Sequence, residues 1–381
     1  MSRAARLRRA LLALVAGLAF AAGVDAGSSP GDGERAARPR VPADVRAAVE
    51  AFYRRALLPD GRVTRRDQGG DTVSEGQAYA LLLTVAVGDE RRFARVWSWT
   101  RRHLLLPDGT LAWHWAGGRV RSDGAAADAD LDAARALALA ARRFDEPAYA
   151  AAARRLGRAL LREQTARAVG TTVLVAGPWA RRTAVINPSY FSPRAYAALR
   201  ALSGDRRWTT VRRSSARLLR ALLDPRPAGL PPDWAKVLPW GVAPVGPPGG
   251  AASSAAAAGA AYGYDAVRMP VRYAESCSAA ERALAARSWP ALHRQAVATG
   301  GYVAAVSALD GRPAAPGAHP AALVGAAASA RAAADAGDPG ASDRLLDRAA
   351  ELEAREPSYY GAAWVALGRV MLTTRLLGGC A

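Results

Sequence analysis

The sequence predicts an all-α protein, and three observations support that prediction. Alanine, leucine and arginine, which are good helix formers, dominate the 381 residues. From Pro42 onward, apolar residues recur at spacings of three and four in many segments, and breaks rich in proline and glycine separate these segments. Strand-like alternation is confined to residues 171–175, where a short edge hairpin would fit.

Taken in chain order, the helical patterns number about twelve. Ser74, Asp89, Asp145 and Asp205 stand where N-cap residues are expected. Successive helical hairpins predict a closed (α/α)6 toroid of six inner and six outer helices. An open solenoid of helix pairs is the alternative, but the chain shows no repeat of fixed period. The expected helices cover residues 43–57, 74–87, 89–104, 129–143, 146–163, 193–202, 205–223, 264–275, 279–298, 320–336, 340–354 and 358–377.

The N-terminus has the three parts of an export signal. Residues 2–9 are rich in arginine, residues 10–24 are apolar, and Val24-Asp25-Ala26 places small residues at a cleavage site. We therefore predict a signal peptide at 1–26, a disordered linker at 27–42 and one domain at 43–378. An uncleaved anchor is the alternative, although the apolar run is short for a bilayer. The expected location is outside the cell or in the envelope, without stable membrane insertion after cleavage.

Composition limits the partners. The formal charge is +19; residues 1–26, with four arginines and one aspartate, account for 3 of it and leave +16. This charge favours polyanions, but no nucleic-acid recognition motif accompanies it, and we expect no nucleic-acid partner.

Cys277 and Cys380 could pair in an oxidising compartment or remain free thiols. No zinc-type cluster occurs, so neither metal nor cofactor is expected, and the chain is expected to be a monomer. Residues 241–261 are of low complexity and predict a mobile surface loop.

Four segments stand out from the alanine- and arginine-rich background. In SEGQ, at 74–77, the carboxylate in the first helical turn could be a simple helix cap. In DADLD, at 128–132, three acids could form a solvated helix start; the segment lacks the further ligands of a calcium loop. In YGYDAVR, at 262–268, Asp265 and Arg268 could form a helical ion pair. INPSYFSP, at 186–193, is a polar entry into a helix.

Together these segments resemble glycoside hydrolase family 8, the family of bacterial endoglucanases and related chitosanases and xylanases. The similar stretches are SEGQAYALLL at 74–83, DADLDAARALALAARRF at 128–144, INPSYFSPRAY at 186–196 and GYDAVRMPVR at 263–272. They occur in the family's order, and the resemblance extends from about residue 45 to residue 375. It implies an (α/α)6 toroid. Alanine stands at 78 and 80, where the family often has glycine, at 127, where it has serine or threonine, and at 133, where it has isoleucine or methionine.

The resemblance also implies roles for four residues. Glu75 would be the general acid that protonates the glycosidic oxygen, and Asp265 the general base that activates water. Tyr190 would help to hold that water, and Asp128 would bind the distorted sugar near Glu75. A pair of carboxylates about 6.5–9.5 Å apart inverts the anomeric centre. A helix N-terminus favours an ionised Glu75, and the charge of Asp128 is the candidate that opposes this.

A glycan-binding site also needs aromatic platforms, since sugar rings present apolar faces. Trp113, Trp115 and Trp234 fall in expected loops near the motifs and are the candidate platforms. Gln77, Tyr264 and Arg268 are the other candidate substrate ligands. The expected activity is endo-hydrolysis of a β-1,4-glucan polysaccharide by inversion. The alternatives are another β-glycan, such as chitosan, xylan or an exopolysaccharide, and a non-catalytic glycan-binding toroid; the positive charge disfavours cationic chitosan.

Overall fold

The structure is a computed structural model that describes residues 40–248, 259–333 and 338–380, and the compact unit begins at Val41. The predicted signal peptide and nearly all of the predicted linker lie outside the described residues. So do residues 249–258 of the predicted mobile loop. Within the described ranges, no helix is long and apolar enough to cross a membrane.

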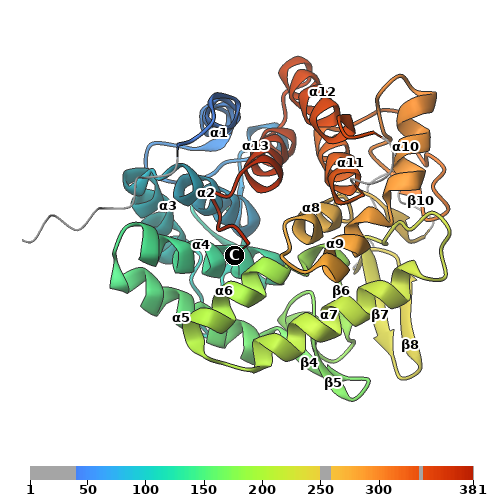
Figure 1. Ribbon diagram of the computed structural model, residues 1–381. Helices are drawn as coiled ribbons and strands as arrows, with labels where there is room; N and C mark the ends of the chain where they lie inside the picture. The colour runs from blue at the N-terminus through green and yellow to red at the C-terminus, as the bar shows by residue number, and fades with distance from the viewer. Residues whose placement is uncertain (1–39, 249–258, 334–337, 381) are drawn as a thin grey trace, which may run out of the picture. The chain divides into compact units, whose positions relative to one another are not determined.

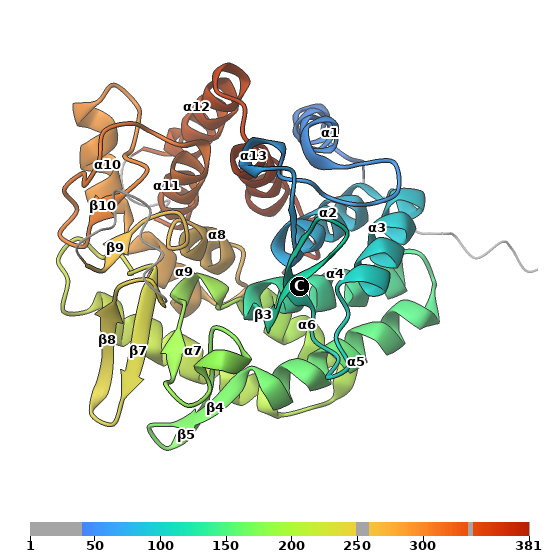
Figure 2. The same cartoon turned by 180° about the vertical axis from the view of Figure 1, so that it is seen from behind.

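The described residues form thirteen α-helices, and six of these make an inner ring. Each inner helix contacts the next, and the last contacts the first, which closes the ring. Figures 1 and 2 show this ring from opposite sides. The closed ring confirms the predicted toroid and rules out an open solenoid. The inner helices are α2 (Ser74–Val87), α4 (Ala127–Arg143), α6 (Pro193–Ser203), α8 (Arg268–Ala274), α11 (Pro320–Ala332) and α13 (Tyr359–Thr373).

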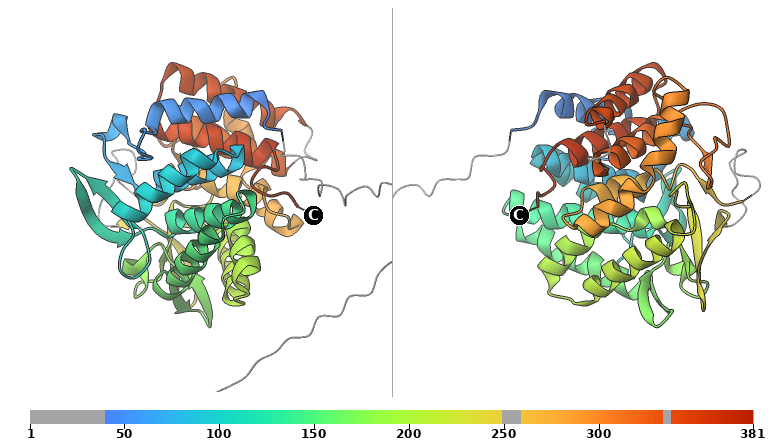
Figure 3. Two further views of the ribbon diagram at one scale, coloured as in Figure 1. Left: turned by 90° about the vertical axis from the view of Figure 1, so that its left-hand side faces the viewer. Right: turned by 45° about the vertical axis from the view of Figure 1, so that its right-hand side comes forward.

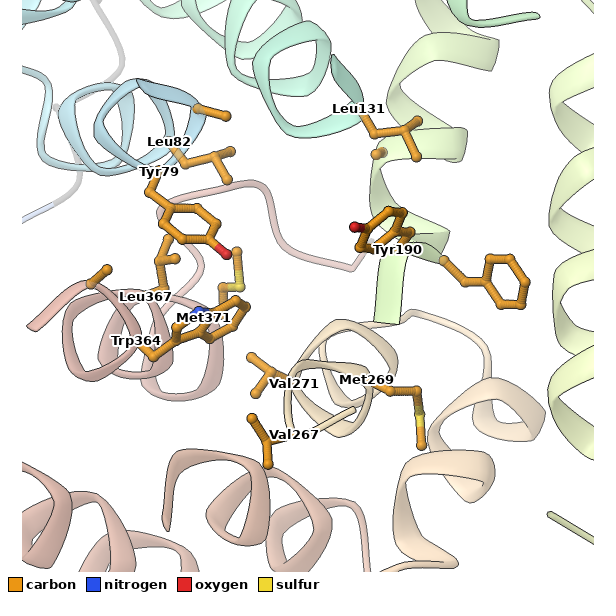
Figure 4. Close-up of a cluster of buried hydrophobic side chains, with 14 of the residues drawn as sticks. Tyr79, Leu82, Leu131, Tyr190, Val267, Met269, Val271, Trp364, Leu367 and Met371 are labelled. Carbon is orange, nitrogen blue, oxygen red and sulfur yellow. The ribbon is translucent and has the colours of Figure 1, made fainter. Parts of the chain in front are cut away.

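The other helices pack around this ring. Outer helices such as α3 and α7 carry many arginines on their outward faces, whereas α2, α4, α11 and α13 are buried on almost every side. Side chains of the inner helices meet at the centre of the ring, where Tyr79 packs edge-on against Trp364 at 5.4 Å between ring centroids (Figure 4). The outer helices are α1 (Ala43–Ala56), α3 (Glu90–His103), α5 (Pro147–Glu163), α7 (Arg207–Leu223), α9 (Ala279–Ala286), α10 (Trp289–Ala298) and α12 (Ala341–Arg355).

Short antiparallel sheets occupy the connections between helices. The hairpin expected near residues 171–175 is present as β4–β5. Trp113, Trp115 and Trp234 lie on strands, not in loops as expected, and residues 241–245 of the predicted mobile loop form β8. The sheets are β1–β2–β3 (Thr72–Val73, Ala112–Ala116, Arg119–Ala125), β4–β5 (Thr165–Ala168, Thr171–Leu174), β6–β7–β8 (Val185–Ile186, Trp234–Leu238, Gly241–Val245) and β9–β10 (Ala261–Tyr262, Ser307–Ala308).

Helix boundaries confirm some of the predicted caps and correct others. Asp89 caps α3 by accepting a hydrogen bond from the Arg92 amide. At α5 the cap is Glu146, not Asp145. Ser74 lies inside the first turn of α2, and its buried hydroxyl has no hydrogen-bond partner. The helix expected over residues 279–298 is two helices, because Pro290 occupies the first turn of α10, where its missing N–H does no harm.

The C-terminal segment is fastened to the ring. Cys277 and Cys380, 103 residues apart in the sequence, form a disulfide, which settles the pairing that the sequence left open. The Arg194 guanidinium donates hydrogen bonds to the Gly378 carbonyl at 2.6 Å and the Gly379 carbonyl at 3.1 Å. The disulfide therefore links the residues just after α8 to the segment that follows α13.

Candidate active site

The N-termini of three inner helices converge on one cluster of charges. Glu75 is the second residue of α2, Asp128 the second residue of α4, and Arg268 the first residue of α8. The positive end of a helix dipole favours a carboxylate at such positions. One turn further along, Arg272 of α8 binds Asp132 of α4 through two hydrogen bonds of 2.7 Å. From Arg268–Asp128 to Arg272–Asp132, both partners advance by four residues, so α4 and α8 run in the same direction.

Arg268 lies at the centre of the cluster and is fully buried. Its Nη1 donates to Asp128 Oδ2 at 2.8 Å and to Glu75 Oε2 at 3.0 Å, while its Nη2 donates to Asp265 Oδ1. The side chains of Glu75 and Asp265 are 25% and 29% exposed, whereas that of Asp128 is 2% exposed. One guanidinium therefore holds three carboxylates, two of which face solvent.

Burial shapes the acidity of this cluster. Burial raises the pKa of Asp128 to about 6; the Arg268 charge opposes this shift and the Glu75 charge adds to it. Burial also raises the pKa of Asp265, against the opposing effects of Arg268, the Asn187 amide and the Trp234 indole. Asp128 and Asp265 thus hold a proton more readily than free carboxylates do.

Asp233, which no sequence motif marks, positions the loop that carries Asp265. Its Oδ1 accepts hydrogen bonds from the amides of Gly263 (3.1 Å), Asp265 (3.1 Å) and Ala266 (2.7 Å). A Cβ on Gly263 would lie 2.6 Å from Asp233 Oδ2, so only glycine fits there. Burial, with the Asp265 charge, raises the pKa of Asp233 to about 7. Because the next residue is Trp234, one strand end supports both the loop and the indole beside Asp265.

The predicted entry segment at 186–193 places Tyr190 against the cluster. Asn187 caps the short 3-10 helix η3 (Pro188–Tyr190) by accepting from the Ser189 amide. The Tyr190 ring lies 5.3 Å from the Arg268 guanidinium carbon, a cation–π contact. Its centroid is 6.1 Å from that of Trp234. All four residues predicted as catalytic therefore gather around Arg268.

The glycine of the SEGQ segment has a steric role beside Glu75. A Cβ at Gly76 would lie 2.5 Å from the hydroxyl oxygen of Tyr359, the first residue of α13. That hydroxyl is buried and has no hydrogen-bond partner. Glycine at this position thus lets α2 and α13 approach each other next to the candidate acid.

The structure separates the predicted platforms. Trp113 is 41% exposed and stacks on His114, so its outer face is free for a ligand. Trp115 is half-buried: the Arg62 guanidinium lies 4.4 Å from its ring centroid and Trp99 packs edge-on against it. Trp115 therefore makes packing contacts that Trp113 does not make, and its role as a sugar platform stays a prediction.

Two further predicted ligands need correction. Gln77 is fully buried. Its Oε1 accepts from the Val63 amide at 2.5 Å and its Nε2 donates to the Thr100 hydroxyl at 2.8 Å, so the side chain has no surface left for a sugar. The prediction that Gln77 binds substrate is wrong. Arg268 is equally inaccessible, and its donors bind the carboxylates and not a sugar hydroxyl. Tyr264, in contrast, is 44% exposed beside Asp265.

The three acids of the DADLD segment are buried, not solvated as the alternative interpretation held. Asp128 and Asp132 pair with the arginines of α8. Asp130 accepts from the Leu111 amide at 3.0 Å and from the Gln164 amide at 2.6 Å, so it ties α4 to two connections. Asp128 and Asp132 thus bind the arginines of α8, whereas Asp130 fixes the position of α4.

Known proteins resemble this chain in sequence and in structure. The chain is 30% identical over 229 residues to a probable endoglucanase of Novacetimonas hansenii, and this alignment covers 58% of this chain and 64% of the relative. It is 34% identical over 173 residues to endoglucanase A of Acetivibrio thermocellus, and this alignment covers 43% of this chain and 36% of the relative. Both alignments therefore span less than two thirds of the relative's length.

Solved structures share the fold over most of the chain. The endo-β-1,4-glucanase CMCax from Acetobacter xylinum superimposes with a TM-score of 0.70 at 25% identity, covering 88% of this chain and all of that one. A β-1,3-1,4-glucanase from Paenibacillus sp. X4 has a TM-score of 0.75 at 20% identity, covering 87% and 91%. The sequence profile of glycosyl hydrolases family 8 matches residues 40–369. The chain belongs to glycosyl hydrolase family 8.

Proposed function

We propose that this chain is an endo-acting hydrolase of β-1,4-glucan that inverts the anomeric centre. The observation that carries the proposal is the single buried guanidinium that Glu75, Asp128 and Asp265 share at the converging helix ends. The relatives named endoglucanase support the choice of a glucan. The exposed aromatic rings near this cluster suit the apolar faces of glucose units.

Glu75 acts as the general acid and Asp265 as the general base. Glu75 protonates the glycosidic oxygen as the bond to the anomeric carbon breaks, while Asp265 takes a proton from the water that attacks the opposite face. They accept from different nitrogens of the Arg268 guanidinium, so the guanidinium keeps the two carboxylates apart. Room for a water between acid and base is what distinguishes inversion from retention.

The remaining residues orient the sugar and the water. Asp128, buried behind Glu75, holds the Arg268 guanidinium in place between the two exposed carboxylates. Tyr190 holds the attacking water. Trp113, Trp234 and Tyr264 contact the sugar rings on either side of the cleaved bond.

Product analysis tests this function. The wild-type chain should release soluble oligosaccharides from β-1,4-glucan, and the first products should carry the α-anomeric configuration by proton NMR. Glu75→Gln should lose at least about a thousandfold in rate, because the leaving group is then unprotonated. Hydrolysis that survives Glu75→Gln, or products that begin as the β-anomer, would contradict the proposal.

We further propose that the chain is exported by residues 1–26 and acts as a monomer outside the cytoplasm. The disulfide between Cys277 and Cys380 supports this location, because such bonds persist in oxidising compartments.

A further inference from the structure

A hollow rich in arginine lies beside the β4–β5 hairpin. Its volume is about 780 Å³, and we call it the arginine hollow. It is bordered by the hairpin, by the short 3-10 helix η2 (Pro178–Ala180) and by the start of α7. Its charged and aromatic lining consists of Arg162, Arg167, Arg181, Arg182, Arg207 and Trp179.

Acidic neighbours neutralise only part of this charge. Glu163 is shared by Arg162 at 2.6 Å and Arg181 at 3.6 Å, and Asp205 binds Arg207 at 2.6 Å. Arg167 and Arg182 are exposed, and no other described residue pairs with either guanidinium. Five arginines thus face two carboxylates. The hollow retains an excess of positive charge, and two of its guanidinium groups have all their donors available.

A row of aromatic rings joins the hollow to the catalytic cluster. Trp179, which is 48% exposed, lies 6.3 Å from Trp234 between ring centroids, and Trp234 lies 6.1 Å from Tyr190. Just before η2, the Ala176 carbonyl accepts from the Ala127 amide at 3.0 Å, next to Asp128. The wall that carries Trp179 is therefore fixed to the N-terminus of α4, and a glycan stacked along the row would extend from the cluster to the arginines.

We infer that the arginine hollow binds anionic substituents, carboxylate or phosphate, on a β-glucan chain whose sugar unit stacks on Trp179. The inference rests on the proposed function and deepens it: the natural polymer is an acidic glucan, not plain cellulose. A neutral chain makes no use of two unpaired guanidinium groups. A guanidinium presents a planar fork of N–H donors that matches a carboxylate or a phosphate. Part of the chain's positive charge thus lies where a polymer would leave the catalytic cluster.

Binding to matched oligosaccharides tests the inference without turnover. The Glu75→Gln chain is titrated calorimetrically with three cello-oligosaccharides of equal length: unmodified, carboxymethylated and phosphorylated. Adding Arg167→Gln and Arg182→Gln should weaken binding of an anionic oligosaccharide about fivefold, as expected for two exposed charge pairs. Binding of the unmodified oligosaccharide should not change. The anionic oligosaccharide that shows the larger loss identifies the preferred substituent.

A matched control removes the same charge elsewhere. Arg91 and Arg95 are exposed arginines of α3, far from the β4–β5 hairpin in Figure 1. Arg91→Gln with Arg95→Gln should leave all three affinities unchanged, and 0.5 M salt should abolish the difference between charged and neutral ligands. The inference is overturned by equal losses for neutral and anionic ligands, by no loss for either anion, or by the same loss in the control. Absence of hydrolysis by the wild-type chain would overturn the proposed function instead, and the affinities would still be measurable.

Discussion

At the scale of single residues, the four predicted catalytic side chains meet because their motifs mark helix ends. Glu75, Asp128 and Asp265 each stand at or just before the start of an inner helix, where short sequence signals are readable. Gln77 was misassigned for a physical reason. The sequence places a polar or aromatic residue near the cluster, but it does not say whether that side chain faces the cleft or the packing behind it.

Asp128 gives the sharpest test at this scale. Its pKa of about 6 in the folded protein exceeds the usual value of about 3.9 for an unfolded chain. The folded state therefore binds more protons between these two values, so the unfolding free energy falls as pH rises from about 4 to about 6. Asp128→Asn should remove about 2 kcal/mol of this fall, as measured by urea unfolding across that range.

The same substitution tests the role of Asp128 in catalysis. A neighbouring negative charge favours the protonated form of an acid, so Asp128→Asn should lower the rate and move the alkaline limb of the pH–rate profile to lower pH. Asp132→Asn is the matched control, since Asp132 lies one turn along α4 and pairs with Arg272 away from Glu75. An unmoved limb in Asp128→Asn would mean that Asp128 only positions Arg268.

At the scale of elements, the helices follow their sequence patterns closely, and the connections do not. Ranges such as 74–87 and 193–202 were predictable because caps, apolar spacing and proline or glycine act locally. The helix expected from residue 264 begins only at Arg268, because three amides of the preceding loop, at residues 263, 265 and 266, donate to Asp233, thirty or more positions earlier. No local signal reports such a distant bond, so sequence reasoning missed both Asp233 and the loop it holds.

Asp233 is therefore a positioning residue for Asp265. Asp233→Ala leaves three loop amides without their acceptor, which should cost about 1–3 kcal/mol of stability. The turnover number should fall about a hundredfold as Asp265 shifts, with KM little changed. Asp233→Asn keeps an oxygen acceptor and should recover most of the turnover at pH 7. If Ala and Asn behave alike in steady-state kinetics, the hydrogen bonds to the loop do not position the base.

At the scale of the whole molecule, the ring has two different ends. The charged cluster lies at the N-termini of α2, α4 and α8, whereas Cys277 follows the C-terminus of α8. The left panel of Figure 3 shows the β2–β3 hairpin at one end of the helices and the C-terminus at the other. The disulfide therefore fastens the ring at the end opposite the cluster. The chain segment between its cysteines includes α13, the helix that closes the ring onto α2.

Because the disulfide lies at the end of the ring opposite the cluster, its loss should lower stability and leave turnover almost unchanged. A disulfide that encloses a segment of 103 residues restricts the unfolded chain, so Cys277→Ser with Cys380→Ser should lose about 4 kcal/mol of stability and about 6 °C in Tm. The turnover number at 25 °C should stay within about twofold, because the cluster lies at the far end of α8. Calorimetric scans with and without reductant supply the control: reductant should lower the Tm of the wild-type chain and leave the double variant unchanged. A loss of turnover by the folded double variant would show instead that closure of the ring at one end sets the geometry of the carboxylates at the other.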